Sequence, residues 1–340
     1  MADDAALNKA RGVASALVGG PVELRGLAAG GRNSRIYRVC DGERPLALKQ
    51  YPSRQDDPRD RLSTEVMALQ LMERACIERV PRVVGVDRHN GYALLSWIEG
   101  APVSEVVEAD IDAAIEFLAA VHAMRRGAEA ATLPMAAEAC LSGVEIERQI
   151  GSRLALLQRL RHEEELIEFL GGSLEPEGER RLAQARIAAA TTGLDFTVDL
   201  PQEWQTLVPA DFGFHNSLRR SDGSLAFVDF EYFGWDDPVK LVADILLHPG
   251  WPLSQSQRLR FRAAAARLYG DDPLFGARLQ AYLPLFALRW VLILLNEFVP
   301  ERWQRRVLAG ETASWEHAKA RQLVRARAFL VALPNLTMEV

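Results

Sequence analysis

Short apolar runs separated by turn residues fill most of the first hundred positions, and they predict a small sheet. Runs rich in β-branched or alternating apolar residues lie at 22–27, 35–39, 46–51, 83–86 and 92–97. A hairpin connection at 40–45 joins the second run to the third, and a turn at 89–91 joins the last two. We therefore expect five strands in this part of the chain.

Helical periodicity appears once inside this region and then dominates the rest of the chain. In the stretch 59–74, Leu62, Val66 and Leu69 recur every three or four residues, which is typical of one face of a helix. The same spacing returns after residue 103, first in a helix with Asp110 as its expected N-cap. Further helices are expected at 145–170, 179–190, 241–247, 255–268, 283–297 and 315–333.

One stretch of the second half breaks this helical pattern. Apolar runs at 207–208 and 225–228 predict two short strands on either side of a turn at 221–224. Together the patterns indicate an α+β protein with two lobes, which a length of 340 residues also favours. We expect a small lobe at 1–97 with a five-stranded antiparallel sheet and one helix, a hinge at 98–102, and a larger, mainly helical lobe at 103–340.

Charge and composition exclude several classes of protein. Forty Lys and Arg residues oppose 46 Asp and Glu residues, so the formal charge is −6 and no broad basic field is available for nucleic acid. The three cysteines have no close spacing, which predicts neither a disulfide framework nor a thiolate zinc site. The first residues are acidic and do not resemble a signal peptide. The apolar stretch 283–298 is short for a membrane span and contains Arg289, so we interpret it as a buried helix in a cytoplasmic protein.

An acidic residue lies inside the apolar stripe of the helix predicted at 59–74. Glu65 shares a face with Leu62, Val66 and Leu69, and would be buried with them. Because an unpaired buried charge is costly, Glu65 needs a cation, and Lys49 on an adjacent strand can provide it. From this helix alone a second interpretation stays open, in which Glu65 lies at the edge of the stripe and reaches water.

A loop with two consecutive glycines connects the first two predicted strands. Gly30 and Gly31 allow the backbone to turn closely over a bound group and to offer it N–H donors. The loop lacks the spaced glycines of a dinucleotide-binding fingerprint and no helix follows it, so a Rossmann fold is disfavoured. An ordinary hairpin turn remains the simpler interpretation of this loop taken alone.

The strongest group of candidate functional residues surrounds the two short strands near residue 220. Asp211 and Asn216 lie five residues apart in one loop, and Asp229 follows the apolar run at 225–228. A hairpin would bring Asn216 and Asp229 together, and such oxygen ligands suit Mg²⁺ beside phosphate groups. Asp211 would then accept a proton from a substrate hydroxyl. Each residue alone could be a turn former, but all three behind a glycine loop, Lys49 and Glu65 favour a chemical role.

These motifs, in this order and over most of the chain, resemble the aminoglycoside phosphotransferase and choline kinase family, which has a protein-kinase-like fold. The resemblance extends to Leu118-Ala-Ala-Val-His122 and to Asp229-Phe-Glu231, which is close to the family's usual Asp-Trp-Glu. It implies that Glu65 orients Lys49 toward the α- and β-phosphates of ATP, that Asp211 is the catalytic base, and that Asn216 and Asp229 bind Mg²⁺. It also implies nucleotide contacts in the glycine loop and the hinge, at Gly30, Gly31, Asn33, Ser34, Trp97, Ile98 and Glu99.

The resemblance implies ATP-dependent transfer of the γ-phosphoryl group to a hydroxyl of a small metabolite, sugar or amino alcohol. The family commonly has His two residues before the catalytic aspartate, whereas this chain has Pro209, so the brace of the loop must be absent or come from elsewhere, with His215 as a candidate. A pseudokinase that serves as a nucleotide-binding or interaction module is therefore the alternative. A protein kinase is disfavoured, because no Ala-Pro-Glu-type segment follows Asp229.

Acidic clusters along the chain bear on the class of acceptor. Acidic groups at 163–165, 236–237 and 271–272 could favour an amine-bearing acceptor, although such runs are usually solvated helix faces. A hydroxylated metabolite or sugar is preferred over an antibiotic. His122 shares its face with apolar residues and is expected to be a hydrogen-bonded core histidine, while Asp244 is expected to brace the catalytic loop.

Overall fold

The N-terminal part of the protein contains the predicted sheet. The computed structural model describes residues 2–26, 34–42, 44–53, 57, 59–308 and 311–338. The first five strands are β1 (Glu23–Gly26), β2 (Arg35–Cys40), β3 (Pro45–Gln50), β4 (Val83–Asp87) and β5 (Tyr92–Ser96). They form one sheet in the order β1-β2-β3-β5-β4, and every neighbouring pair is antiparallel. The five-stranded antiparallel sheet is therefore confirmed.

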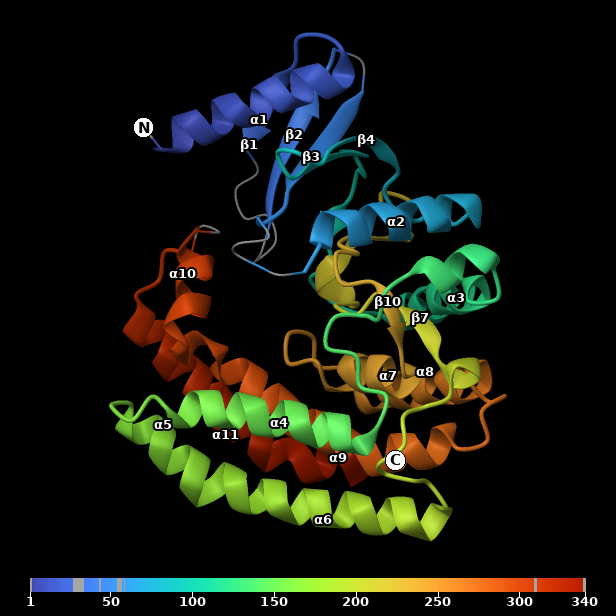
Figure 1. Cartoon of the computed structure of the whole chain (residues 1–340), viewed down its shortest axis with the longest axis vertical. Helices are drawn as coiled ribbons and strands as arrows, with labels where there is room; N and C mark the ends of the chain where they lie inside the picture. The colour runs from blue at the N-terminus through green and yellow to red at the C-terminus, as the bar shows by residue number, and fades with distance from the viewer. Residues whose placement is uncertain are drawn as a thin grey trace.

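Two helices cover this sheet, where the sequence predicted one. Helix α2 (Arg61–Arg74) matches the prediction, and Asp60 caps it by accepting a hydrogen bond from the Ser63 amide. Helix α1 (Ala2–Val18) was not predicted, and it lies against the sheet in Figure 1. Alternate residues of β5 pack in two different apolar clusters, one with α1 and one with α2, so the helices cover opposite faces. The buried face of α1 includes Ala10 and Ala14, whose small side chains give a weak periodic signal.

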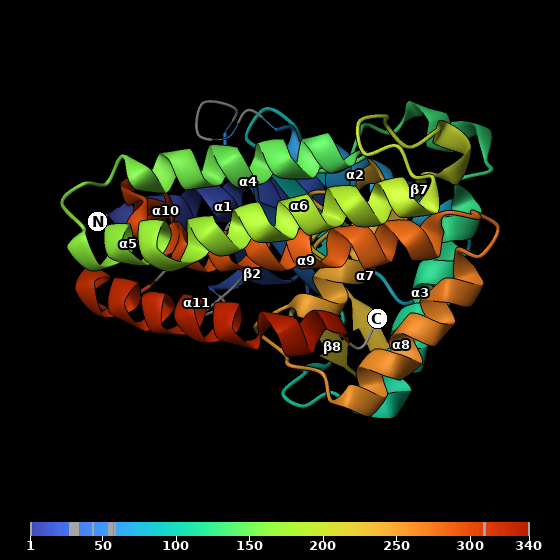
Figure 2. The same ribbon diagram turned by 90° about the horizontal axis from the view of Figure 1, so that it is seen from below.

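The rest of the chain is mainly helical, as predicted. Four long helices run side by side at the end of the molecule away from the sheet (Figures 1 and 2): α4 (Gly143–Gln158), α6 (Glu175–Thr192), α9 (Phe275–Leu294) and α11 (Trp315–Met338). The other helices of this part are α3 (Glu108–Met124), α5 (Glu164–Phe169), α7 (Pro238–Leu247), α8 (Gln255–Leu268) and α10 (Pro300–Leu308). Helix α10 was not predicted.

The single helix expected at 145–170 is wrong. The chain turns between α4 and α5, over residues 159–163, although no Gly or Pro lies there. Leu166 and Phe169 of α5 are buried in the core, so packing rather than local propensity decides this turn. The helix then returns as α6 alongside α9.

The short strands of the second half form two small sheets. Strand β7 (Thr206–Val208) pairs with β10 (Gly234–Asp236), while β8 (Ser217–Arg219) pairs with β9 (Leu225–Phe227) and with β6 (Ala101–Pro102). The two predicted strands are therefore present, and the turn at 221–224 joins β9 to the unpredicted strand β8 rather than to β7. Strand β8 has the sequence Ser-Leu-Arg, which gives no apolar run by which to detect it.

Helix α9 and the short helix η5 (Leu295–Phe298) form one apolar helical stretch of 24 residues, Phe275–Phe298. Within the described part of the chain it is the one stretch long and apolar enough to cross a membrane by length and composition alone. However, 72% of its most apolar window is buried inside the fold, between α6, α7 and α11. The burial agrees with the predicted core helix, which begins eight residues earlier than the expected 283.

Candidate active site

Lys49 and Glu65 form the predicted buried ion pair. Lys49 on β3 is 3% exposed and Glu65 on α2 is 1% exposed, and 2.6 Å separates Lys49 Nζ from Glu65 Oε2. The same carboxylate oxygen accepts a hydrogen bond from the Tyr51 hydroxyl at 2.7 Å, and Oε1 accepts one from the Phe230 amide at 3.1 Å. Glu65 therefore points into the protein, and the interpretation in which it reaches water is wrong.

Two further carboxylates surround the Lys49 ammonium. Asp229 Oδ1 lies 2.7 Å and Glu231 Oε2 lies 3.3 Å from Nζ. Burial alone would lower the pKa of Lys49, but the carboxylates of Asp229, Glu65 and Glu231 outweigh it and hold that pKa well above its ordinary value. Burial raises the pKa of Asp229 to about 7 against the attraction of Lys49, and the two neighbouring carboxylates add to the rise. The cluster thus carries more negative charge than Lys49 balances.

Glu231 is a residue of this site that the sequence analysis did not select. Its buried carboxylate accepts hydrogen bonds from the Ser34 hydroxyl at 2.9 Å and from Arg61 Nη1 at 2.8 Å. Ser34 is thereby placed beside the cluster, whereas Gly30, Gly31 and Asn33 lie outside the described residues. The available signal was the spacing of Asp229 and Glu231, two carboxylates two residues apart after an apolar strand.

Asp211 and Asn216 belong to the loop between β7 and β8. The side-chain amide of Asn216 donates a hydrogen bond to the backbone carbonyl of Asp211 at 2.9 Å. The backbone carbonyl of Asn216 accepts one from the Val228 amide at 2.9 Å. Asn216 is therefore fixed next to the residue that precedes Asp229. Asp229 itself has φ +70°, a left-handed conformation that turns the chain sharply after β9.

The loop is braced without the missing histidine at position 209. Instead, His215 Nε2 lies 3.3 Å from Asp211 Oδ1, and the Asp211 amide donates to the Pro209 carbonyl at 2.9 Å. The His215 ring stacks on Trp251 with 4.6 Å between ring centroids. His215 and Asn216 thus both contact Asp211.

The predicted nucleotide contacts of the hinge, Trp97, Ile98 and Glu99, lie between β5 and β6. The last two residues of the predicted hinge, at 101–102, form β6 and pair with β8. Ile98 is buried, and the Arg38 guanidinium lies 4.7 Å from the centroid of the Trp97 ring. Glu99 is exposed and accepts a hydrogen bond from Arg38 Nη2 at 3.0 Å. The Glu99 side chain therefore contacts β2, while the backbone of Trp97, Ile98 and Glu99 enters no strand ladder.

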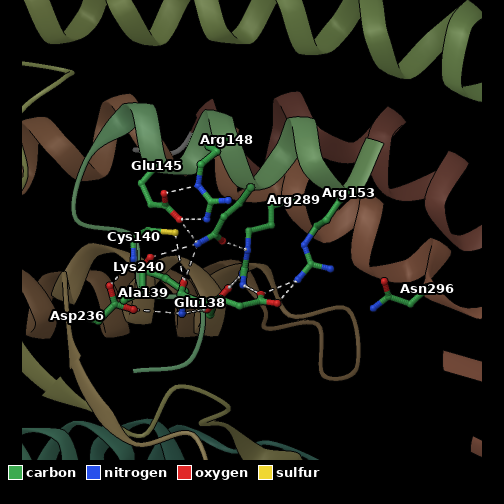
Figure 3. Close-up of polar contacts among 12 residues, drawn as sticks. Glu138, Ala139, Cys140, Glu145, Arg148, Arg153, Asp236, Lys240, Arg289 and Asn296 are labelled. Atoms are coloured by element: carbon green, nitrogen blue, oxygen red, sulfur yellow. Dashed lines mark hydrogen bonds and ion pairs between the residues drawn. The ribbon is translucent and has the colours of Figure 1, made fainter. Parts of the chain in front are cut away.

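A pocket of about 540 Å³ includes Asp211 in its wall. Its other side is formed by residues from α4, α7, α9 and α10 and from the segment before α4. In Figure 3 the side chains of Arg153 and Arg289 both point toward Glu138. Each places a guanidinium nitrogen 2.6 Å from Glu138 Oε2. Burial alone would raise the pKa of Glu138, but the two arginines outweigh it and lower that pKa to about 2.

The family model described as the phosphotransferase enzyme family matches residues 23–280. The chain belongs to the phosphotransferase enzyme family. A search of curated proteins found no match.

Several solved structures share the fold of this phosphotransferase family member. Choline kinase LicA from Streptococcus pneumoniae has a TM-score of 0.58 at 15% identity, over 95% of this chain and 97% of that one. The ethanolamine kinase of Plasmodium vivax has a TM-score of 0.55 at 11% identity, over 94% of this chain and 84% of that one. Spectinomycin phosphotransferase, solved with ADP and spectinomycin, has a TM-score of 0.59 at 10% identity, over 95% of each chain. The protein-kinase-like fold is confirmed.

In this phosphotransferase family member, the motif Asp236-Asp237 is structural. Asp236 accepts a hydrogen bond from the Cys140 amide at 2.8 Å, and Asp237 caps α7 through the Val239 amide at 2.9 Å. Asp244 lies 3.4 Å from both Lys240 and Arg289, in the wall of the pocket that contains Asp211. It supports that wall, while the contacts that brace the Asp211 loop come from His215 and Asn216.

The acidic groups that favoured an amine-bearing acceptor do not face this pocket. None of the residues 163–165, 236–237 and 271–272 is in its wall as far as the chain is described. Asp237 and Asp272 contact Arg278, and Glu163 contacts Lys319. His122 is half-buried, and its Nδ1 lies 2.7 Å from the Thr206 hydroxyl, which confirms a hydrogen-bonded core histidine.

Proposed function

We propose that the protein is an ATP-dependent kinase that transfers the γ-phosphoryl group to a hydroxyl of a small molecule. The observation that carries the proposal is the position of Lys49, whose ammonium lies within 2.7 Å of both Glu65 and Asp229. A lysine oriented by a helix carboxylate, beside a carboxylate that can hold metal, is the arrangement that phosphoryl transfer requires. Relatives in fold that are named for choline, ethanolamine and spectinomycin support a small-molecule acceptor.

The residues around Asp229 fit a divalent cation. Asp229, Glu65 and Glu231 can place three carboxylate oxygens within 4.8 Å of one another, with more negative charge than Lys49 neutralises. We assign Asn216 and Asp229 as the Mg²⁺ ligands. The side-chain N–H of Asn216 donates to the loop, which leaves its side-chain oxygen Oδ1 for a cation. When bound, Mg²⁺ supplies neutralisation of the charge on the transferring phosphoryl group.

Asp211 is the proposed catalytic base. Its carboxylate would accept the hydroxyl proton of the acceptor, held in place by His215 at 3.3 Å and by the loop contacts of Asn216. Lys49 would contact the α- and β-phosphates, and Gly30, Gly31, Asn33 and Ser34 would form the loop that covers them. The backbone of Trp97, Ile98 and Glu99 would hydrogen-bond the adenine, at the hinge between a lobe at 1–97 and a lobe at 103–340. We place the enzyme in the cytoplasm.

Thermal unfolding tests this function before the acceptor is known. The unmodified protein is heated alone, with Mg²⁺, with ATP, with both, and with GTP and Mg²⁺. At a nucleotide concentration of about a hundred times Kd, binding should stabilise the fold by about 2.7 kcal/mol and raise the unfolding temperature. We expect the Mg²⁺-dependent part of this rise to disappear in Asp229→Ala.

Asp211→Asn is the matched variant for the chemical step. It should retain the rise in unfolding temperature with ATP and Mg²⁺, because Asp211 is not assigned to the nucleotide. It should release no ADP in the presence of an acceptor. A rise that Asp229→Ala keeps in full contradicts the metal assignment, and no rise with any nucleotide contradicts the kinase and favours an interaction module.

A further inference from the structure

The pocket beside Asp211 has a surplus of basic side chains. Eight residues in its wall are Arg or Lys, and four are Asp or Glu. Several of these cations have carboxylate partners: Arg59 and Arg61 contact Asp57, Lys240 contacts Asp236, and Arg306 contacts Glu297. Arg302 has no such partner among the described residues, and Arg153 shares the Glu138 carboxylate with Arg289. Both arginines line this pocket and also a neighbouring pocket of about 830 Å³.

Arg302 on α10 is half-buried and has no carboxylate within 4.0 Å among the described residues. Its Nη1 donates a hydrogen bond to the side-chain oxygen of Asn296, which is neutral. Burial lowers the pKa of Arg302, and the positive charges of Arg153, Arg305 and Arg59 lower it further. The negative charge of Glu138 acts in the opposite direction. The guanidinium therefore lies among like charges that its own contacts do not balance.

One guanidinium nitrogen of Arg153 on α4 has no hydrogen-bond partner. Its Nη2 is 2.6 Å from Glu138 Oε2, but its Nη1 is buried and makes no hydrogen bond. Glu138 cannot balance the group, because Arg289 contacts the same carboxylate oxygen at 2.6 Å. A buried donor without a partner is costly and is expected to be satisfied by a ligand or water.

We propose that the acceptor carries a carboxylate or phosphate group besides its reactive hydroxyl, and that Arg153 and Arg302 bind this oxyanion. Guanidinium groups suit carboxylate and phosphate oxygens because they donate two parallel hydrogen bonds. The pocket that contains both arginines also contains Asp211, so an acceptor anchored at the arginines presents its hydroxyl to the base. An acceptor with an ammonium group would instead meet surplus positive charge.

The proposal rests on the proposed function, in which one bond forms and one breaks. The acceptor oxygen forms a bond to the γ-phosphorus, and the bond from that phosphorus to the β,γ-bridging oxygen breaks. The bridging oxygen leaves with ADP, and the hydroxyl proton passes to the Asp211 carboxylate. The arginines take no part in these bonds and only bind and orient the acceptor.

ADP release with ATP and Mg²⁺ tests the acceptor class. Four series are compared: hydroxy acids such as D-glycerate and D-gluconate, the sugar phosphate ribose 5-phosphate, the neutral polyols glycerol and ribitol, and the amino alcohols ethanolamine and choline. We expect turnover in one of the two anionic series, which also distinguishes carboxylate from phosphate. Arg302→Gln and Arg153→Gln should raise the KM of that acceptor about 10- to 100-fold and leave the KM of ATP unchanged.

Arg180→Gln is the matched control, since Arg180 is exposed on α6 and is absent from the wall of the pocket. It should leave both KM values unchanged. Preference for a neutral or amine-bearing acceptor overturns the proposal, and so does an equal acceptor KM in Arg302→Gln and Arg180→Gln.

A binding measurement keeps the test independent of turnover. D-glycerate, D-gluconate and ribose 5-phosphate are added without nucleotide, at matched ionic strength, and the unfolding temperature is recorded. It should rise in the unmodified protein and in Arg180→Gln, and stay constant in Arg302→Gln. Anion binding in a protein whose unfolding temperature no nucleotide raises supports the oxyanion site and contradicts only the proposed kinase. A protein that binds none of these anions overturns the inference.

Discussion

Some buried charges in this protein have more than one partner of opposite charge. Lys49 meets three carboxylates, and Arg278 lies between Asp237 and Asp272. Each of these groups has lost its water and depends on all of its partners for compensation. A substitution at one of them therefore affects several contacts, and its effect should exceed that of an exposed charge.

His122 gives a pH-dependent prediction for a single residue. Burial, aided by Arg125 and Arg126, lowers its pKa from 6.5 to about 4. The unfolded chain therefore binds the proton more tightly, so the stability that neutral His122 contributes is complete above pH 6.5 and is lost as the pH falls toward 4. In His122→Asn, whose side chain can still contact Thr206, the free energy of unfolding should fall less between pH 7 and pH 5.

Urea unfolding at the two pH values measures this difference. His317→Asn serves as the control, because His317 is exposed on α11. An unchanged pH dependence in His122→Asn would show that protonation of this ring does not oppose folding.

The course of the loop between β7 and β8 depends on packing against one aromatic ring. Gly213 lies between Asp211 and Asn216, and a Cβ atom added there would overlap the side chain of Trp251. Trp251 in turn stacks on His215, which contacts Asp211. The loop element and its aromatic support therefore form one unit in which a small residue is required.

Gly213→Ala should disturb this unit. Because the rigid Trp251 ring must move, we expect the free energy of unfolding to fall by about 1–3 kcal/mol. ADP release should fall as well, since His215 moves with the ring. Urea unfolding and the ADP assay measure the two effects.

Gly151→Ala provides the comparison. Gly151 is exposed within α4, and nothing lies within 4 Å of an added Cβ, so alanine should stabilise the helix by up to about 1 kcal/mol. Equal effects of the two substitutions would contradict the tight fit of Gly213.

Across the whole molecule, the Lys49 cluster joins parts that are far apart in the sequence. Lys49 comes from β3, Glu65 from α2, and Asp229 and Glu231 from the segment after β9. The sheet and the segment after β9 therefore meet in one buried set of charges, and its loss should weaken the whole fold.

Lys49→Met removes the cation from this cluster. Three neighbouring carboxylates then lose their shared partner, and we expect the free energy of unfolding at neutral pH to fall by about 3–5 kcal/mol. Urea unfolding measures the change, and Lys9→Met on the exposed side of α1 should alter it by less than about 0.5 kcal/mol. A fall as small as that of Lys9→Met would mean that the cluster contributes little to stability.

The sequence alone determined the sheet, most of the helices and the core of the candidate site. Strands and helices with continuous apolar periodicity are set by local spacing, and Glu65 in an apolar stripe requires a cation wherever the chain folds. The pairing with Lys49 follows from this requirement. The roles of Asp211, Asn216 and Asp229 stay predictions, although the structure brings Asp229 to Lys49.

The tertiary structure alone decided the rest. Residues 138, 153, 289 and 302 meet at one pocket although they are separated by up to 164 positions, and no local pattern marks them. The break between α4 and α5, the pairing of β8 and the role of Glu231 likewise depend on which distant side chains share the interior. Local periodicity reports only whether a face is buried, whereas the partner across the interface and the net charge of a pocket arise when separate elements pack together.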